Sequence, residues 1–143
     1  MKTSFLRYEL VDTIPRSIND GTVYVSRKYA TAVHNCCCGC KNQVVTPLGP
    51  TDWKVEISGS AITVYPSIGN WSLPCRSHYW IDQGRVLWAE QWSQARIDFG
   101  RDCDRAAKQR QYGGRLDSSV PKEKPHKKQP SFWRQLWNIL IGK

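Results

Sequence analysis

The chain has 143 residues, with 21 Lys and Arg against 12 Asp and Glu and a formal net charge of +9, which fits one domain of ordinary size with a basic appendage. Hydrophobic residues make up 40% of the sequence and charged residues 23%, and this balance excludes wholesale disorder. No apolar run approaches the roughly 20 residues of a membrane helix, and the first residues lack the apolar stretch of a signal peptide. We therefore expect a cytoplasmic protein.

Residues 1–100 carry the signals of strands and turns. Apolar and polar side chains alternate over residues 53–58, as in a half-buried strand, and turn sequences at 58–60 and 82–84 indicate two hairpins. Short β-rich stretches predict strands over residues 22–25, 29–33, 43–46, 53–58, 62–65, 79–81 and 85–88. The predicted fold class is mainly β: a small antiparallel β domain over residues 1–100, with a core that we expect tryptophans to fill.

Charge and composition change after residue 100. Residues 1–100 carry ten Lys and Arg against eight Asp and Glu, whereas residues 101–143 carry eleven against four. The segment 101–130 has few large aliphatic side chains, which predicts a basic flexible linker with a short helix over residues 102–111. Residues 131–143 repeat apolar side chains at spacings of three and four. This pattern predicts a C-terminal amphipathic helix that lies on a partner, on the β domain or, as third choice, on an acidic membrane.

Cysteines are bunched in the run HNCCCGC at residues 34–40, and a further one begins CRSH at 75–78. Disulfides are not expected in a reducing compartment, whereas four thiolates are good ligands for a tetrahedral Zn²⁺ ion. Gly39 allows the bend that brings Cys38 and Cys40 to one ion, and Cys75 is the third expected ligand. For the fourth, strand parity favours Cys36, with Cys37 and His78 as competitors. The predicted metal ligands are Cys36, Cys38, Cys40 and Cys75; buried thiols without a metal are the alternative.

Two histidines and two serines lie beside these cysteines in the sequence: His34, His78, Ser67 and Ser77. A serine nucleophile needs a histidine base within hydrogen-bond reach. Because sequence neighbours point in opposite directions along a strand, a working pair would be Ser77 with His34, or Ser67 with His78. The alternative is that the histidines bond backbone groups around the metal, and the residues alone favour that structural role.

Three phrases occur in order along the chain: HNCCCGC at 34–40, PSIGNW at 66–71 and CRSHYWI at 75–81, followed by Gly84 and VLW at 86–88. From about Gly21 to Trp88 the chain resembles a small cysteine-rich bacterial family, long classed as a domain of unknown function. The genes of that family accompany bacterial ubiquitination-like (Bub) operons, which also encode a ubiquitin-like protein and relatives of activating and conjugating enzymes.

The resemblance implies work on ubiquitin-like conjugates: a deubiquitinase-like peptidase that matures or removes the modifier, with Ser77, His78, His34 and Ser67 as candidate catalytic residues and zinc as a structural ion. Such a peptidase needs a groove for the extended tail of the modifier. The ubiquitin-like protein, its conjugates and the enzymes of the same operon are the expected partners. A zinc-containing adaptor without a reactive group is the alternative. Specific nucleic-acid binding is not expected, because the basic charge lies in the tail and not among the aromatic residues of the domain.

Overall fold

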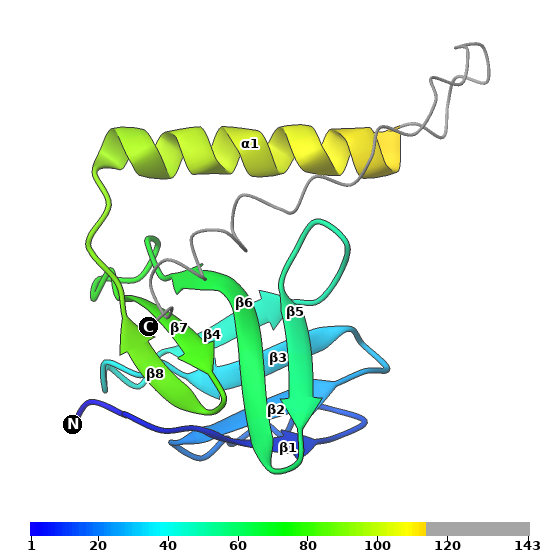
Figure 1. Ribbon diagram of the computed structural model, residues 1–143, viewed down its shortest axis with the longest axis vertical. Helices are drawn as coiled ribbons and strands as arrows, with labels where there is room; N and C mark the ends of the chain where they lie inside the picture. The colour runs from blue at the N-terminus through cyan, green and yellow to red at the C-terminus, as the bar shows by residue number, and fades with distance from the viewer. Residues whose placement is uncertain (114–143) are drawn as a thin grey trace.

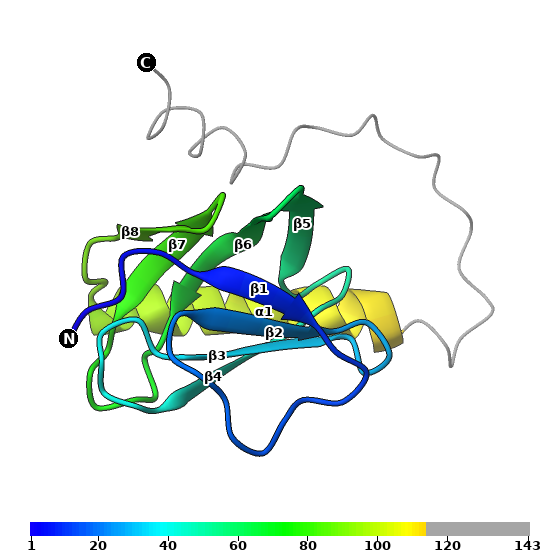
Figure 2. The same ribbon diagram turned by 90° about the horizontal axis from the view of Figure 1, so that it is seen from below.

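The computed structural model describes residues 1–113, whose strands form two four-stranded sheets (Figures 1 and 2). The first sheet contains, in spatial order, β1 (Arg7–Leu10), β2 (Thr22–Ser26), β3 (Thr31–Asn35) and β4 (Gln43–Pro47). The second contains β5 (Lys54–Ser58), β6 (Ala61–Gly69), β7 (His78–Asp82) and β8 (Arg85–Trp88). The helix α1 (Gln94–Tyr112) follows the strands. The expected mainly β fold is confirmed.

Neighbouring strands pair antiparallel, apart from β1 and β2, which run parallel. Both expected hairpins form: Lys54 pairs with Tyr65 across β5 and β6, and Asp82 pairs with Arg85 across β7 and β8. β1 is not among the strands expected from the sequence. Its side chains are mostly exposed, so its strand conformation follows from backbone pairing with β2 and not from burial of one face.

The inner faces of the two sheets pack against each other and form the main core. Aliphatic side chains fill most of it, with Tyr79 as its largest fully buried side chain. The expectation that tryptophans fill the core is wrong, because none of the five in the described residues is buried. Trp53 only packs against the core from a partly exposed position. The alternation along β7 explains the difference: Tyr79 and Ile81 point inward, and Trp80 between them points outward.

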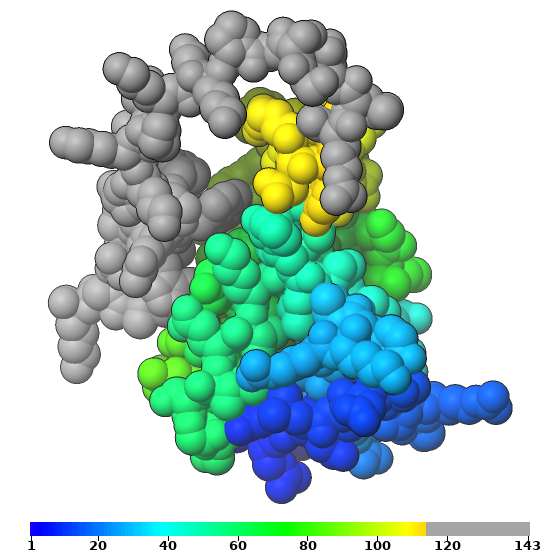
Figure 3. Space-filling model, turned by 90° about the vertical axis from the view of Figure 1, so that its right-hand side faces the viewer, coloured from blue at the N-terminus to red at the C-terminus, as the bar shows by residue number. Residues whose placement is uncertain are grey.

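The helix α1 lies across one end of the sheets, where β6 ends and β5 begins (Figure 1). Ser93 caps it by accepting a hydrogen bond from the Arg96 amide, and Ile97 is its buried residue. At the other end of the helix, Lys108 pairs with Asp52 at 2.9 Å, so the helix rests on the segment between β4 and β5 (Figure 3). The helix is thus longer than the expected 102–111 and crosses the expected boundary at residue 100.

The segment before β1 joins the two sheets. The Leu6 amide donates to the Gly84 carbonyl at 2.7 Å, and the Val86 amide donates to the Ser4 carbonyl at 2.9 Å. The next residue, Arg7, already belongs to β1 of the first sheet. The chain therefore passes from one sheet to the other within three residues.

The described helix is not long and apolar enough to cross a membrane. The amphipathic helix expected over residues 131–143, and most of the expected linker, lie outside the described residues.

Candidate active site and metal site

An irregularity in β6 sets the position of Ser67. Between Val64 and Ile68, β6 advances four residues while its partner β7 advances two, from Ile81 to Tyr79, so extra residues bulge out of the ladder. Ser67 lies in this bulge. Its hydroxyl oxygen is 2.9 Å from Nε2 of His78, the first residue of β7.

The second ring nitrogen of His78 defines the proton positions. Nδ1 lies 2.8 Å from the backbone carbonyl oxygen of Glu90, and a carbonyl oxygen can only accept a hydrogen bond. Nδ1 therefore carries the proton, Nε2 has a free lone pair, and the Ser67 hydroxyl donates to it. In this arrangement an imidazole can remove the proton of a serine nucleophile, with the Glu90 carbonyl in the orienting place that a carboxylate has in a triad.

Three tryptophans surround His78. The ring centroids of Trp71, Trp92 and Trp80 lie 4.9, 5.0 and 5.8 Å from that of the imidazole, and only 3% of His78 is exposed. This burial lowers the pKa of His78 below 6.5; the hydrogen bond to the Glu90 carbonyl opposes the shift, and the positive charge of Arg96 adds to it. His78 is therefore neutral at neutral pH.

Gly69 makes room for one of these tryptophans. A Cβ atom at residue 69 would lie 2.3 Å from Nε1 of Trp71, far inside contact distance. The indole thus lies directly against the glycine backbone, and its ring contacts His78. The phrase PSIGNW therefore supplies the serine, the space and the indole that covers the imidazole.

Ser77 points to the opposite side of the chain from His78, its neighbour. It is only 4% exposed. Its hydroxyl oxygen accepts a hydrogen bond from Nδ2 of Asn70 at 2.8 Å and lies 3.1 Å from Sγ of Cys36. The Asn70 amide and the Ser77 carbonyl also form a backbone hydrogen bond of 2.8 Å, which closes the loop between β6 and β7.

His34 is buried in the core and bonds a tyrosine instead of a serine. Its Nε2 is 2.8 Å from the hydroxyl of Tyr79, and burial lowers the pKa of His34 to about 4. In the described part of the chain no hydrogen bond joins His34 to Ser77. Of the two serine and histidine pairs that the sequence suggests, the structure brings together Ser67 and His78.

The side chains of the four cysteines that were predicted as metal ligands converge between the loop after β3 and the loop before β7. The Sγ atoms of Cys36, Cys38, Cys40 and Cys75 all lie within 4.8 Å of one another. Cys36 is 3.4 Å from Cys38 and 3.9 Å from Cys75, sulfur to sulfur. Four sulfurs at about 2.3 Å from a tetrahedral Zn²⁺ ion would be about 3.8 Å apart, so this cluster fits a metal ion of that size and geometry.

The pKa values of the thiols differ across the cluster. The backbone N–H of Asn42 is the main cause that lowers the pKa of Cys40 to about 6, whereas burial raises that of Cys38 to about 12. Cys40 is thus a thiolate at neutral pH, whereas Cys38 would have to lose its proton in order to bind a metal ion.

The competing ligands lie elsewhere. Cys37 is fully buried in the main core, and burial raises its pKa to about 12. His78 uses both ring nitrogens for Ser67 and Glu90. Cys103 is an exposed free thiol on α1.

Residues outside the sequence-based candidates complete the site. Glu90 acts through its backbone, so no side-chain pattern could reveal it. Asn70 and Trp71 belong to the phrase PSIGNW, and Tyr79 follows His78 directly. Their position next to the candidate serines and histidines in the sequence is the signal that could have pointed to them.

Comparison with known proteins identifies the family of this chain. No curated protein and no solved structure matches the chain. A family model described as "Bacterial ubiquitination-like system serine protease (BubE)" matches residues 10–89, more than half of the chain. The matched segment includes Ser67, His78 and the four cysteines of the cluster. The chain belongs to the BubE family.

Proposed function

We propose that this chain is a serine peptidase in which Ser67 is the nucleophile and His78 is the general base. The observation that supports this most is the path of hydrogen bonds from the Ser67 hydroxyl to Nε2 of His78, and from Nδ1 to the Glu90 carbonyl, at 2.9 and 2.8 Å. Ser67 is partly exposed, whereas Ser77 is buried among thiols.

The chemistry follows from the proton positions. Ser67 Oγ attacks the carbonyl carbon of the scissile bond and gives its proton to Nε2 of His78. The imidazolium then donates that proton to the leaving amine, so that the bond breaks and an acyl ester remains on Ser67. Water attacks this ester, its proton passes to Nε2, and the Ser67 oxygen takes it back as the carboxylic acid leaves.

The cysteine cluster would hold a structural Zn²⁺ ion. Its four sulfurs would fill a tetrahedral coordination sphere, which leaves no position for a reacting water. When bound, the ion supplies a cross-link between the loop that contains Cys36, Cys38 and Cys40 and the loop that contains Cys75. The second loop leads directly into β7, so the cross-link would support the position of His78.

The substrate that fits the family is a bacterial ubiquitin-like protein, either as its precursor or as its conjugates. Maturation and removal of the modifier both cleave the bond after its C-terminal residue. Activating-enzyme and conjugating-enzyme relatives of the same system are the expected further partners. The six cysteines are all free in the structure, and we place the protein in the cytoplasm, where thiols stay reduced.

A fluorophosphonate probe tests the nucleophile, because it forms a stable ester with an activated serine. Peptide mapping of the labelled protein should find the probe on Ser67, and Ser67→Ala should abolish labelling. The same preparation should cleave a fusion of the ubiquitin-like protein to a fluorescent reporter at the end of the modifier. Labelling of Ser77 would overturn the assignment. Absence of both labelling and cleavage in zinc-loaded protein would favour the adaptor alternative.

A further inference from the structure

The ladder between β5 and β6 stops just before it reaches Ser67. Its last pair is Lys54 with Tyr65. Hydrogen-bonded pairs recur at every second position from the two-residue turn between these strands, so a regular continuation would place Ser67 opposite Asp52, whose amide would donate to the Ser67 carbonyl. The Asp52 amide instead donates to the carbonyl of Gly49 at 3.3 Å. The main chain before β5 thus turns away from Ser67.

On its other side, β6 also leaves Ser67 outside the regular pairing. The register with β7 passes directly from Val64 to Ile68, so that residues 65–67 lie in the bulge. The residue before Ser67 is Pro66, which has no amide proton to donate. In the part of the chain that the structure describes, neither strand register includes Ser67. Its backbone therefore needs another partner if the hydroxyl is to keep a fixed position.

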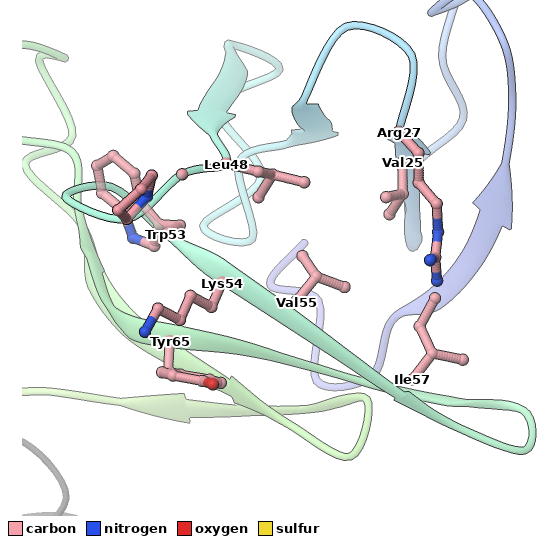
Figure 4. A pocket seen from close by; sticks show the side chains of 10 residues that line it. Val25, Arg27, Leu48, Trp53, Lys54, Val55, Ile57 and Tyr65 are labelled. Carbon is pink, nitrogen blue, oxygen red and sulfur yellow. The ribbon is translucent and has the colours of Figure 1, made fainter.

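The side chain of Trp53 is that partner. Its Nε1 donates to the Ser67 carbonyl oxygen at 3.3 Å, and an indole N–H can only donate. Figure 4 shows Trp53 where β5 begins, among the residues that line a groove beside this strand. The indole thus supplies the hydrogen bond that the amide of Asp52 would supply in a regular ladder.

Trp53 is itself held by the end of β4 and the loop after it. Its amide donates to the Pro47 carbonyl at 3.1 Å, and its carbonyl accepts from the Gly49 amide at 3.2 Å. The indole is partly buried and packs against the main core. The neighbouring residue Asp52 pairs with Lys108 of α1. The donor to Ser67 is therefore fixed from the first sheet, from the core and from the helix.

The position of the Ser67 hydroxyl depends on this hydrogen bond. Ser67 is held at its hydroxyl, which lies 2.9 Å from Nε2 of His78, and at its carbonyl by the indole of Trp53. Because both groups are attached to one Cα atom, a shift of the carbonyl also moves the hydroxyl. A misplacement of about 1 Å at a reacting group can slow a reaction by about 10²-fold.

We propose that Trp53 is a positioning residue for the nucleophile, whose indole N–H holds the backbone of Ser67 so that the hydroxyl stays within hydrogen-bond reach of His78. This proposal rests on the proposed peptidase function and adds a residue that acts through Ser67. It differs from a packing role, in which the size of the indole would matter and its N–H would not.

The test removes the N–H and keeps the shape of the ring. Benzothienylalanine has a sulfur atom in place of the indole N–H, and stop-codon suppression introduces it at position 53 of the full-length protein. Trp53→Phe is the simpler second variant. We expect kcat for the reporter fusion to fall about tenfold or more, with KM changed less than about twofold. The midpoint of thermal unfolding should stay within about 4 °C of the parent for the analogue.

The matched control makes the same two replacements at Trp88. That side chain is 41% exposed on β8 and lies outside the proposed catalytic pair. Both replacements at Trp88 should keep kcat within about twofold of the parent. The comparison separates the N–H of Trp53 from a general effect of changing a tryptophan in this protein.

A spectroscopic measurement reports the position of Ser67 without turnover. The ¹⁵N chemical shift of Nε2 in neutral His78 depends on whether a hydroxyl donates to it, and Ser67→Ala gives the value without that hydrogen bond. With benzothienylalanine at position 53, the Nε2 resonance should move most of the way to this value. The control at Trp88 should leave the resonance in place.

The proposal is overturned if the folded protein with benzothienylalanine at position 53 keeps either the parent kcat or the parent Nε2 resonance, or if the replacements at Trp88 have equal effects. Loss of folding in Trp53→Phe would leave the decision to the analogue. Cleavage of the reporter fusion by Ser67→Ala would instead overturn the serine assignment, and the Nε2 resonance would then judge the role of Trp53 without kcat.

Discussion

Two serine and histidine neighbourhoods meet at β7, and only one has the geometry of a catalytic pair. In the outer pair, Ser67 and His78, the hydroxyl faces a ring nitrogen that is free to accept its proton. In the inner pair, Ser77 and His34, the hydroxyl bonds an amide and lies beside thiols, and the imidazole bonds Tyr79. Ser77 and His78 are adjacent in sequence, so the alternation of the chain separates a serine bonded to Asn70 from a histidine bonded to Ser67.

The largest expected effect separates the two serines. Ser67→Ala should lower kcat for the reporter fusion by about 10³-fold or more, because the nucleophile is lost. Ser77→Ala should keep kcat within about tenfold and instead lower the free energy of unfolding by about 1–3 kcal/mol, because the buried amide of Asn70 loses its shortest hydrogen bond. Initial-rate assays measure kcat, and chemical denaturation measures the free energy of unfolding. The reverse pattern in folded proteins would exchange the roles of the two pairs.

The second prediction tests whether a metal ion holds the cysteine cluster beside Ser77 together. Cys75→Ser should remove the bound zinc and lower the free energy of unfolding by about 3 kcal/mol or more, since metal binding is coupled to folding. Cys103→Ser removes an exposed thiol on α1 and is the matched control, with no expected change. Elemental analysis and thermal denaturation provide the readouts. Full zinc content in Cys75→Ser would remove Cys75 from the ligand set.

The pair of Ser67 and His78 can also be disturbed through Trp71, whose indole covers the imidazole. In Gly69→Ala the new methyl group must displace Trp71, which should lower stability by about 1–3 kcal/mol. Because water then reaches more of the His78 ring, the pKa of His78 should rise toward 6.5. Gly100→Ala is a useful comparison, because a Cβ there meets Trp92 only at 3.7 Å and alanine favours a helix by about 1 kcal/mol. Unchanged stability of Gly69→Ala would mean that the loop adjusts freely around Trp71.

The smallest expected effect concerns the pH dependence of kcat/KM. Burial first, and the charge of Arg96 next among the lowering causes, keep the pKa of His78 below 6.5. In the proposed mechanism neutral His78 takes the proton of Ser67, so kcat/KM should rise with pH up to a plateau and fall about tenfold per pH unit below that pKa. Arg96→Gln should move the profile to higher pH, because removal of a positive charge makes protonation easier. Arg101→Gln, an exposed position on the same helix, should leave it in place; equal profiles for all three proteins would exclude the influence of Arg96.

Much of the fold could be predicted from local sequence patterns. The difference between the two serine and histidine pairs could not. The β5–β6 and β7–β8 hairpins were predictable because their side chains alternate and their turns contain glycine. Gly39 and strand parity also indicated which four sulfurs converge, although a metal there stays a prediction. Residues 7–10 alternate polar and apolar side chains over only four positions, and this strand forms by pairing with β2 across an intervening loop. The bulge before Ile68 brings Ser67 to His78, and nothing in the local sequence reveals the number of extra residues in a ladder.

The amide of Leu6 bonds the carbonyl of Gly84, and this contact has a consequence for how the protein forms. During synthesis from the N-terminus, Ser4 and Leu6 must wait until about eighty further residues have been made before they meet Val86 and Gly84. Folding of the complete β domain is therefore a late event, dominated by contacts between distant parts of the chain, which are the slowest to form. Since the Glu90 carbonyl that accepts the hydrogen bond of His78 follows shortly after that contact, the arrangement of Ser67, His78 and Glu90 is completed only after the chain has emerged beyond the last strand.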